Sequence, residues 1–176
     1  MTVGGLLAIA CHGASPTPPA PPPVVTVVPD SVIPPPRRVQ PDTALSTAER
    51  DAIVREAQTR RAAWRALGIQ DYHIRVAAGC FCPWPQTPAI LEVRHGVAVE
   101  LRDTTGRKFG PLREPWSVYT VEGLFDLVEQ AARRNDMVEV TYNARFGYPT
   151  YVRGDARLGL PDDWFWVRAT ELTPRP

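Results

Sequence analysis

Three cysteines are the most reactive side chains in this sequence. Cys80 and Cys82 form a C-x-C pair, and Cys11 stands alone near the N-terminus. If Cys11 is modified, an even pair remains, which in an exported protein indicates a disulfide. We therefore expect a structural bridge between Cys80 and Cys82. Two alternatives stay open: a thiol-redox pair, and a metal site in which His73 or His95 joins the two thiolates.

Cys11 follows a short apolar segment, Val3 to Ala10, that ends in Leu7-Ala8-Ile9-Ala10. This segment resembles a bacterial lipobox, in which a cysteine receives lipid and the preceding residues are removed. No Lys or Arg precedes the apolar run, as a signal peptide normally requires, and a start codon further upstream would explain this. We expect residues 1–11 to be a lipoprotein signal and Cys11 to be lipidated. A conventionally cleaved signal and the absence of export are the alternatives.

Residues 12–45 contain more than half of the 20 prolines in the chain. Runs such as PTPPAPPP favour polyproline II and cannot build a hydrophobic core. Such a tether extends by about 3 Å per residue, which gives a reach on the order of 90 Å. We expect it to hold a single domain, residues 46–173, away from a membrane. The predicted location is the bacterial cell envelope, with the domain facing the periplasm or the exterior.

Two helices are expected in this domain. Ser46-Thr47-Ala48-Glu49 fits a capping box at the start of a helix over residues 46–67. A second helix runs to residue 134 and is capped by Thr120 or Ser117. His95-Gly96 is typical of a two-residue turn between strands. Alternation of apolar and polar residues predicts strands over 71–78, 90–94, 97–101, 138–143, 150–153 and 164–172.

The predicted hairpin over residues 138–155 is rich in tyrosine. Its connection contains Gly147, and Pro149 begins the second strand. Packing within the hairpin is the simplest interpretation of its aromatic rings. The alternative is that they form a ligand surface. The candidate binding residues are Tyr142, Tyr148 and Tyr151.

The element order is αβββ followed by αβββ, and the two halves are weakly similar. Six strands in a mostly antiparallel sheet, with both helices on one face, would bury both apolar helix stripes. The sequence therefore predicts an α+β fold. Duplication of one αβββ unit is a further hypothesis.

Several pieces of the chain together resemble an uncharacterised bacterial family of exported proteins and lipoproteins, domain of unknown function 6174. The resemblance covers about Trp64 to Leu172 and departs at Asn143-Ala144, where Asp-Pro is expected. It implies a shared fold and location, and it carries no activity. The matching pieces are Trp64, Asp71-Tyr72, Cys80-Phe81-Cys82, Val93 with Gly96-Val97, Leu124-Phe125, Tyr142, Gly147-Tyr148-Pro149-Thr150, Asp155 and Asp163.

Catalytic groups are few in this domain. There is no Gly-rich phosphate loop and no His-Glu metal motif. Glu122 and Glu129 are expected on a solvated helix face. A group of acidic residues near turns suits turn formation better than a calcium site. These residues are Asp155, Asp162 and Asp163.

The net charge is +1, which gives no general attraction to nucleic acid. We predict a non-catalytic, lipid-anchored domain without cofactor or metal. It binds an unknown envelope protein or cell-wall component through its sheet or its aromatic hairpin. The alternatives are a thiol-redox or metal-handling protein that uses Cys80 and Cys82, and a secreted inhibitor-like module.

Overall fold

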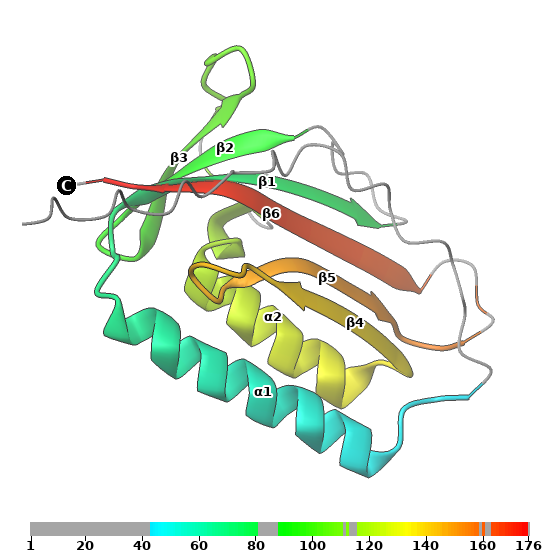
Figure 1. The fold of residues 1–176 in the computed structure, drawn as a ribbon. Helices are drawn as coiled ribbons and strands as arrows, with labels where there is room; N and C mark the ends of the chain where they lie inside the picture. The colour runs from blue at the N-terminus through cyan, green and yellow to red at the C-terminus, as the bar shows by residue number, and fades with distance from the viewer. Residues whose placement is uncertain are drawn as a thin grey trace, which may run out of the picture.

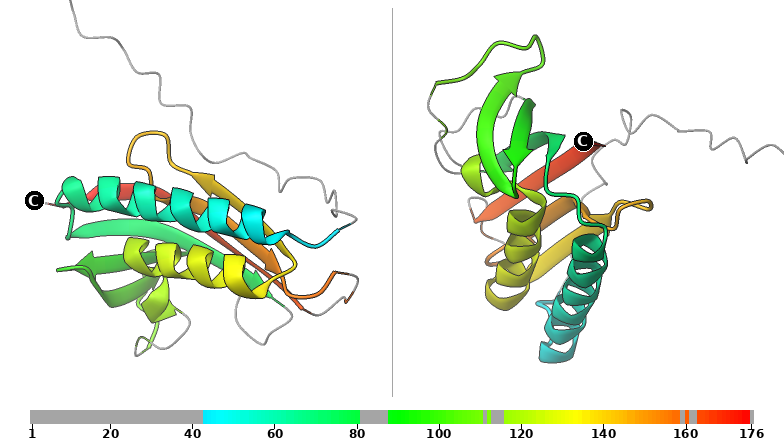
Figure 2. Two further views of the ribbon diagram at one scale, coloured as in Figure 1. Left: turned by 90° about the horizontal axis from the view of Figure 1, so that it is seen from below. Right: turned by 90° about the vertical axis from the view of Figure 1, so that its left-hand side faces the viewer.

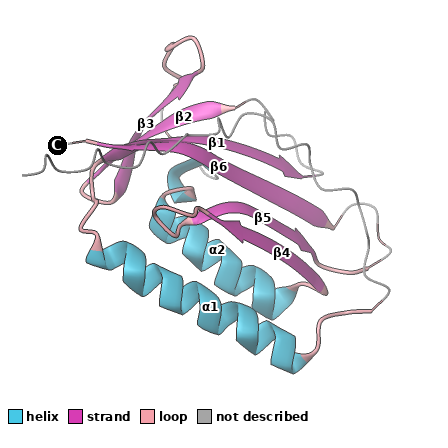
Figure 3. Cartoon of the chain, in the orientation of Figure 1, coloured by secondary structure: helices cyan, strands magenta, loops and turns pink. Residues whose placement is uncertain are grey.

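The structure is a computed structural model that describes residues 43–80, 88–110, 112, 116–158, 160 and 163–175. Cys11, Cys82 and Asp162 lie outside these residues, as do the predicted signal and nearly all of the predicted tether. The described chain has the predicted order of elements (Figures 1 and 3). These are α1 (Thr47–Ala66), β1 (Tyr72–Cys80), β2 (Ala89–Arg94), β3 (Val97–Asp103), the 3-10 helix η2 (Trp116–Val118), α2 (Val121–Arg134), β4 (Met137–Tyr142), β5 (Pro149–Asp155) and β6 (Trp164–Pro174).

The six strands form one open sheet in the order β3-β2-β1-β6-β5-β4. Every neighbouring pair is antiparallel, and β6 returns to the middle of the sheet to pair with β1. Both helices lie on the same face of this sheet (Figure 2). The predicted α+β fold is therefore confirmed. The other face, which we call the helix-free face, is not covered by either helix.

The two αβββ units share an element order but are not related by a simple duplication. Each strand of the first unit lies three places along the sheet from its counterpart in the second. In an antiparallel sheet such counterparts run in opposite directions. A rotation that superposed them would turn the sheet over and move its helix to the opposite face. Since both helices share one face, the topology does not support the duplication hypothesis.

Both helices begin where the sequence predicts. Ser46 and Glu49 form the complete capping box of α1. Of the two candidates for α2, Thr120 is the cap, because its hydroxyl accepts a hydrogen bond from Gly123 N at 3.1 Å. Neither helix of the described residues is both long and apolar enough to cross a lipid bilayer.

The hydrophobic core fills the space between the helices and the sheet. Trp64 near the end of α1 meets the rings of Tyr72 and Tyr148 edge to face, with centroids 5.8 and 6.2 Å apart. α2 adds a buried stripe that includes Leu124 and Phe125. Alternate residues of the strands complete the core, among them Ile74, Val76, Leu91, Val93, Val152, Val167 and Ala169.

Among the described residues, two other than glycine have a left-handed backbone. His95 has φ of 49° and Gly96 has φ of 76°, which confirms the predicted two-residue turn between β2 and β3. Glu171 has φ of 54° in β6. It lies where the β1–β6 register shifts, so the end of β6 is bulged.

Candidate functional site

The predicted cysteine pair is only partly described. Cys80 is the last residue of β1 and has an interaction partner. Because Cys82 lies outside the described residues, the disulfide, redox and metal interpretations stay predictions. His73 and His95, the suggested metal partners, belong to β1 and to the β2–β3 turn.

The three candidate tyrosines do not form one surface. Tyr148 is 1% exposed and packs in the core, so it offers no ligand surface. Tyr142 packs against the core, and the guanidinium of Arg60 in α1 lies 4.3 Å from its ring centroid. Only Tyr151 lies on the helix-free face, since its neighbour Val152 points into the core.

Tyr151 belongs to a group of four half-buried side chains on the helix-free face, which we call the β5–β6 patch. The group consists of Tyr151 and Arg153 on β5 and Trp166 and Arg168 on β6. The strand register sets Tyr151 opposite Arg168 and Arg153 opposite Trp166. The two aromatic residues therefore occupy one diagonal of the patch, and the two arginines occupy the other.

Small residues on β1 give this patch its shape. Trp166 pairs with Gly79, and Arg168 pairs with Ala77. A Cβ atom at position 79 would be only 2.4 Å from Nε1 of Trp166, so the indole occupies the space that the glycine leaves. On the β5 side, the guanidinium of Arg168 lies 5.7 Å from the ring centroid of Tyr151, within cation–π range.

The two arginines of the patch make no ion pair with any described residue. Arg153 lies opposite Glu139 of β4, yet no salt bridge joins them. Every other half-buried arginine in the described part of the chain does make an ion pair. Burial raises the pKa of Tyr151, the charge of Glu139 raises it further, and the two arginines oppose the rise. The patch therefore presents two arginines without a direct ion pair beside two aromatic rings, and Glu139 is the acidic residue next to it.

At the β2 end of the same face the arginines have an acidic partner. Glu92 is 7% exposed and accepts hydrogen bonds from Arg94 at 2.8 Å and Arg175 at 3.0 Å. His73 lies 3.5 Å from the same carboxylate. The hydrogen bond from Arg94 is the main cause of the lowered pKa of Glu92. This cluster holds the C-terminal end of β6 against β1 and β2, and each of its arginines has the carboxylate of Glu92 as a partner.

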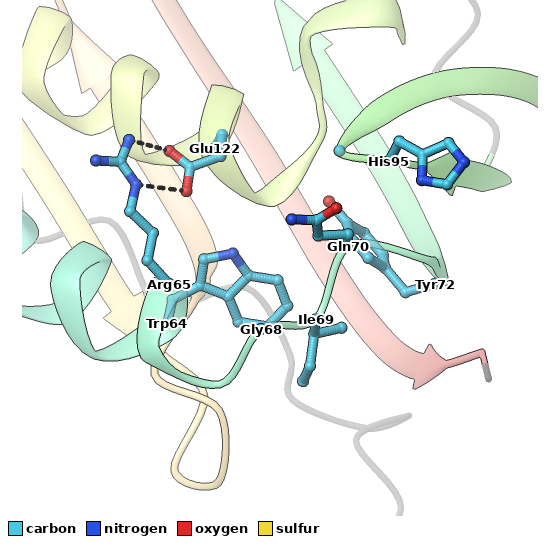
Figure 4. Close-up of a pocket in the computed structure, with 9 residues that line it drawn as sticks. Trp64, Arg65, Gly68, Ile69, Gln70, Tyr72, His95 and Glu122 are labelled. Atoms are coloured by element: carbon cyan, nitrogen blue, oxygen red, sulfur yellow. Dashed lines mark hydrogen bonds and ion pairs between the residues drawn. The ribbon is translucent and has the colours of Figure 1, made fainter.

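A shallow hollow of about 250 Å³ lies between the end of α1 and the start of α2 (Figure 4). Arg65 forms a two-point ion pair with Glu122 on one side, at 3.0 and 2.7 Å, and His95 lies on the other side. The hydroxyl of Tyr72 is occupied, because it accepts a hydrogen bond from Val121 N at 2.8 Å. The lining contains no serine, threonine or cysteine nucleophile. A second hollow of similar volume shares His95 and is lined by Asp71, Arg94 and Arg175.

The acidic helix residues are less exposed than the sequence suggests. Glu129 and Glu122 both pair with Arg61 of α1 at 3.1 Å, and the side chain of Glu129 is only 14% exposed. They therefore join the two helices, which corrects the expectation of a solvated face. A helix periodicity places residues on a face, but it does not show that a second helix covers that face.

The acidic residues near turns differ in their surroundings. Asp155 is 2% exposed at the end of β5, and Asp163 pairs with Arg157 at 2.9 Å. Asp162 lies outside the described residues. No group of three potential metal-ligating side chains occurs among the residues that the structure describes.

The sequence did not single out Arg153, Trp166 and Arg168. A signal for two of them was present, because Trp164, Trp166 and Arg168 occupy alternate positions of β6 and so share a face. Which face they share depends on the placement of the helices. The pairing of β6 with both β1 and β5, which assembles the patch, depends on contacts between residues far apart in the chain.

These observations define an α+β domain with an open antiparallel sheet of six strands and two helices on one face. The chain belongs to DUF6174, a family of unknown function, whose model matches residues 56–174. The match runs from within α1 to the end of β6 and agrees with the resemblance read from the sequence. No curated protein and no solved structure matches the chain. Because the function of this family is unknown, membership does not indicate an activity for the chain.

Proposed function

We propose that this domain is a non-catalytic binding module that recognises a protein partner through the helix-free face of its sheet. The observation that carries the proposal is the β5–β6 patch. Tyr, Trp and Arg are the residue types that most often dominate the binding energy of protein interfaces. Here both aromatic residues and both arginines are adjacent on one sheet, whose backbone is already ordered before binding.

A module of this kind fits an exported protein held at a membrane, which is the second part of the proposal. Cys11 carries a lipid anchor, and the proline-rich segment 12–45 lets the domain reach a partner at a distance from the membrane. Cys80, the last residue of β1 and the neighbour of Gly79, forms a disulfide with Cys82. These assignments rest on the sequence patterns and on the position of Cys80.

The proposal that a partner binds the helix-free face is tested by photo-crosslinking in the cells that produce the protein. A photoreactive residue replaces Thr141, which is exposed on the helix-free face opposite Tyr151. The matched control carries the same residue at Thr59, which is exposed on α1. We expect one discrete protein adduct from position 141, lost in Tyr151→Ala, and no such adduct from position 59. Equal adducts from both positions would contradict a face-specific interaction.

The lipid anchor on Cys11 and the disulfide between Cys80 and Cys82 are tested by mass spectrometry. The intact mass of the protein isolated from its own cells is measured before and after thiol alkylation. We expect a lipid adduct on Cys11 and no alkylation of the other two cysteines. An unlipidated chain would overturn the anchor, and alkylation of Cys80 and Cys82 without a reductant would overturn the bridge.

A further inference from the structure

We propose that the partner of the β5–β6 patch presents an extended acidic segment, with carboxylates at alternate positions that pair with Arg153 and Arg168. This inference rests on the proposed function and names the chemistry of the partner. It identifies the occupant of the patch by charge complementarity.

The first support is the unpaired state of the two arginines. The side chains of Arg153 and Arg168 are half-buried, but their guanidinium nitrogens stay accessible and are free to make charge-assisted hydrogen bonds with a carboxylate. Arg50, Arg60, Arg61, Arg75 and Arg102 are half-buried too, and each of them has an acidic partner. Arg168 has only Tyr151 and Ala77 as its cross-strand neighbours. Glu139 lies opposite Arg153 without an ion pair to it, so acidic groups from outside the domain would give both arginines the partner they lack.

The second support is the spacing of the two strand positions that carry the arginines. Arg153 and Arg168 are diagonal neighbours on adjacent antiparallel strands, and such positions are about 7–8 Å apart. In an extended chain, alternate residues point to the same side and lie about 7 Å apart. Two carboxylates at alternate positions can therefore reach both guanidinium groups at once.

The third support is the shape of the surrounding surface. Ala77 leaves the β1 side of the patch low beside Arg168, so a peptide backbone can approach the sheet there, whereas the indole of Trp166 fills the space above Gly79. Trp166 and Tyr151 occupy the other diagonal and offer apolar contact area to side chains that flank the two carboxylates. The expected motif is thus acidic–x–acidic with an apolar or aromatic neighbour.

The test is a selection of random linear peptides on the immobilised full-length chain. Synthetic copies of the most enriched peptides are then titrated against two double variants. Arg153→Gln with Arg168→Gln removes both charges from the patch. Arg55→Gln with Arg134→Gln removes two exposed arginines that make no ion pair in the described structure, so the change in net charge is matched. Melting temperatures verify that each variant is folded.

We expect enrichment of Asp or Glu at alternate positions. The patch double variant should bind such a peptide at least about tenfold more weakly, because it loses both charge-assisted interactions. The control double variant should bind it unchanged. Failure to enrich any peptide, absence of acidic enrichment, or equal binding by the two double variants would overturn the acidic inference.

A separate variant distinguishes this failure from failure of the proposed function. Tyr151→Ala removes an aromatic ring of the patch and leaves both arginines in place. If non-acidic peptides are selected and Tyr151→Ala abolishes their binding, the face is a binding site and only its charge preference is wrong. If Tyr151→Ala leaves the binding of all selected peptides unchanged, the proposed function is wrong as well.

Discussion

The indole of Trp166 on β6 occupies the space above Gly79 of β1, where a Cβ atom would be 2.4 Å from Nε1. Gly79→Ala must therefore displace the indole or shift a central strand pair. Overpacking of this kind costs about 1–3 kcal/mol. We expect the free energy of unfolding, measured in urea, to fall by that amount, with a change in tryptophan emission. The control is Gly110→Ala, where nothing lies within 4 Å of the added Cβ. A Gly79→Ala protein as stable as this control would contradict the packing.

Arg50 of α1 caps the C-terminal end of α2. Its guanidinium donates to the carbonyl oxygens of Ala132 at 2.8 Å and Asn135 at 2.6 Å. Arg50→Ala leaves these acceptors without that donor, and we expect the free energy of unfolding to fall by about 2 kcal/mol. Arg55→Ala, on the same helix but exposed and without an ion pair in the described structure, should change it by less than about 0.5 kcal/mol. Equal effects of the two changes would contradict the capping role.

Tyr72 makes the free energy of unfolding depend on pH in the alkaline range. Burial raises the pKa of its phenol from 10.0 to about 12, while the unfolded chain has the ordinary value. Its stabilising contribution is therefore complete below pH 10 and is lost as the pH rises toward 12. We expect a loss of about 1 kcal/mol per pH unit in this window, and a shallower loss in Tyr72→Phe.

The same variant tests the hydrogen bond of Tyr72 at neutral pH. Tyr72→Phe leaves the Val121 amide without its phenol acceptor, which should cost about 1–3 kcal/mol. Unfolding in urea across a pH series measures both effects. Identical pH slopes for Tyr72→Phe and the unchanged protein would contradict the assignment.

His95 has a left-handed backbone in the turn before Gly96, and asparagine adopts this conformation more readily than histidine. His95→Asn should raise the free energy of unfolding by about 0.5 kcal/mol. The amide of His95 donates to Asp71 at 2.9 Å, and this bond is kept in the variant. A destabilised His95→Asn protein would show that the imidazole, which borders both hollows, makes a contribution of its own.

Local patterns in the sequence predicted the elements of this fold well. The capping box at Ser46 and Glu49 and the turn at His95-Gly96 are each set by residues at most three positions apart in the chain, and the structure places them as expected. The α+β class followed from the element order. The duplication hypothesis was not supported. It depended on how the two halves of the sheet join, and they join by the antiparallel pairing of β1 with β6.

The candidate site was predictable only in part. Tyr151 was identified among three tyrosines, but alternation alone does not tell which side of a hairpin faces the helices. Tyr148 lies in the core because Trp64, 84 positions earlier, packs against it. The β5–β6 patch brings together residues of two strands, and its small neighbours come from a third. Such an arrangement is fixed by strand register, which depends on contacts across the whole sheet.

The claim that the two unpaired arginines bind an acidic partner is tested most directly at Ala77, which pairs with Arg168. Ala77→Glu places a carboxylate opposite Arg168 and should satisfy it within the domain, as cross-strand opposite charges do. Ala77→Gln has a similar size and no charge. The readout is the yield of the photo-crosslinked adduct from position 141. We predict that Ala77→Glu abolishes the adduct while its stability is kept or slightly raised, and that Ala77→Gln retains most of the yield. Equal yields from the two variants would contradict the account.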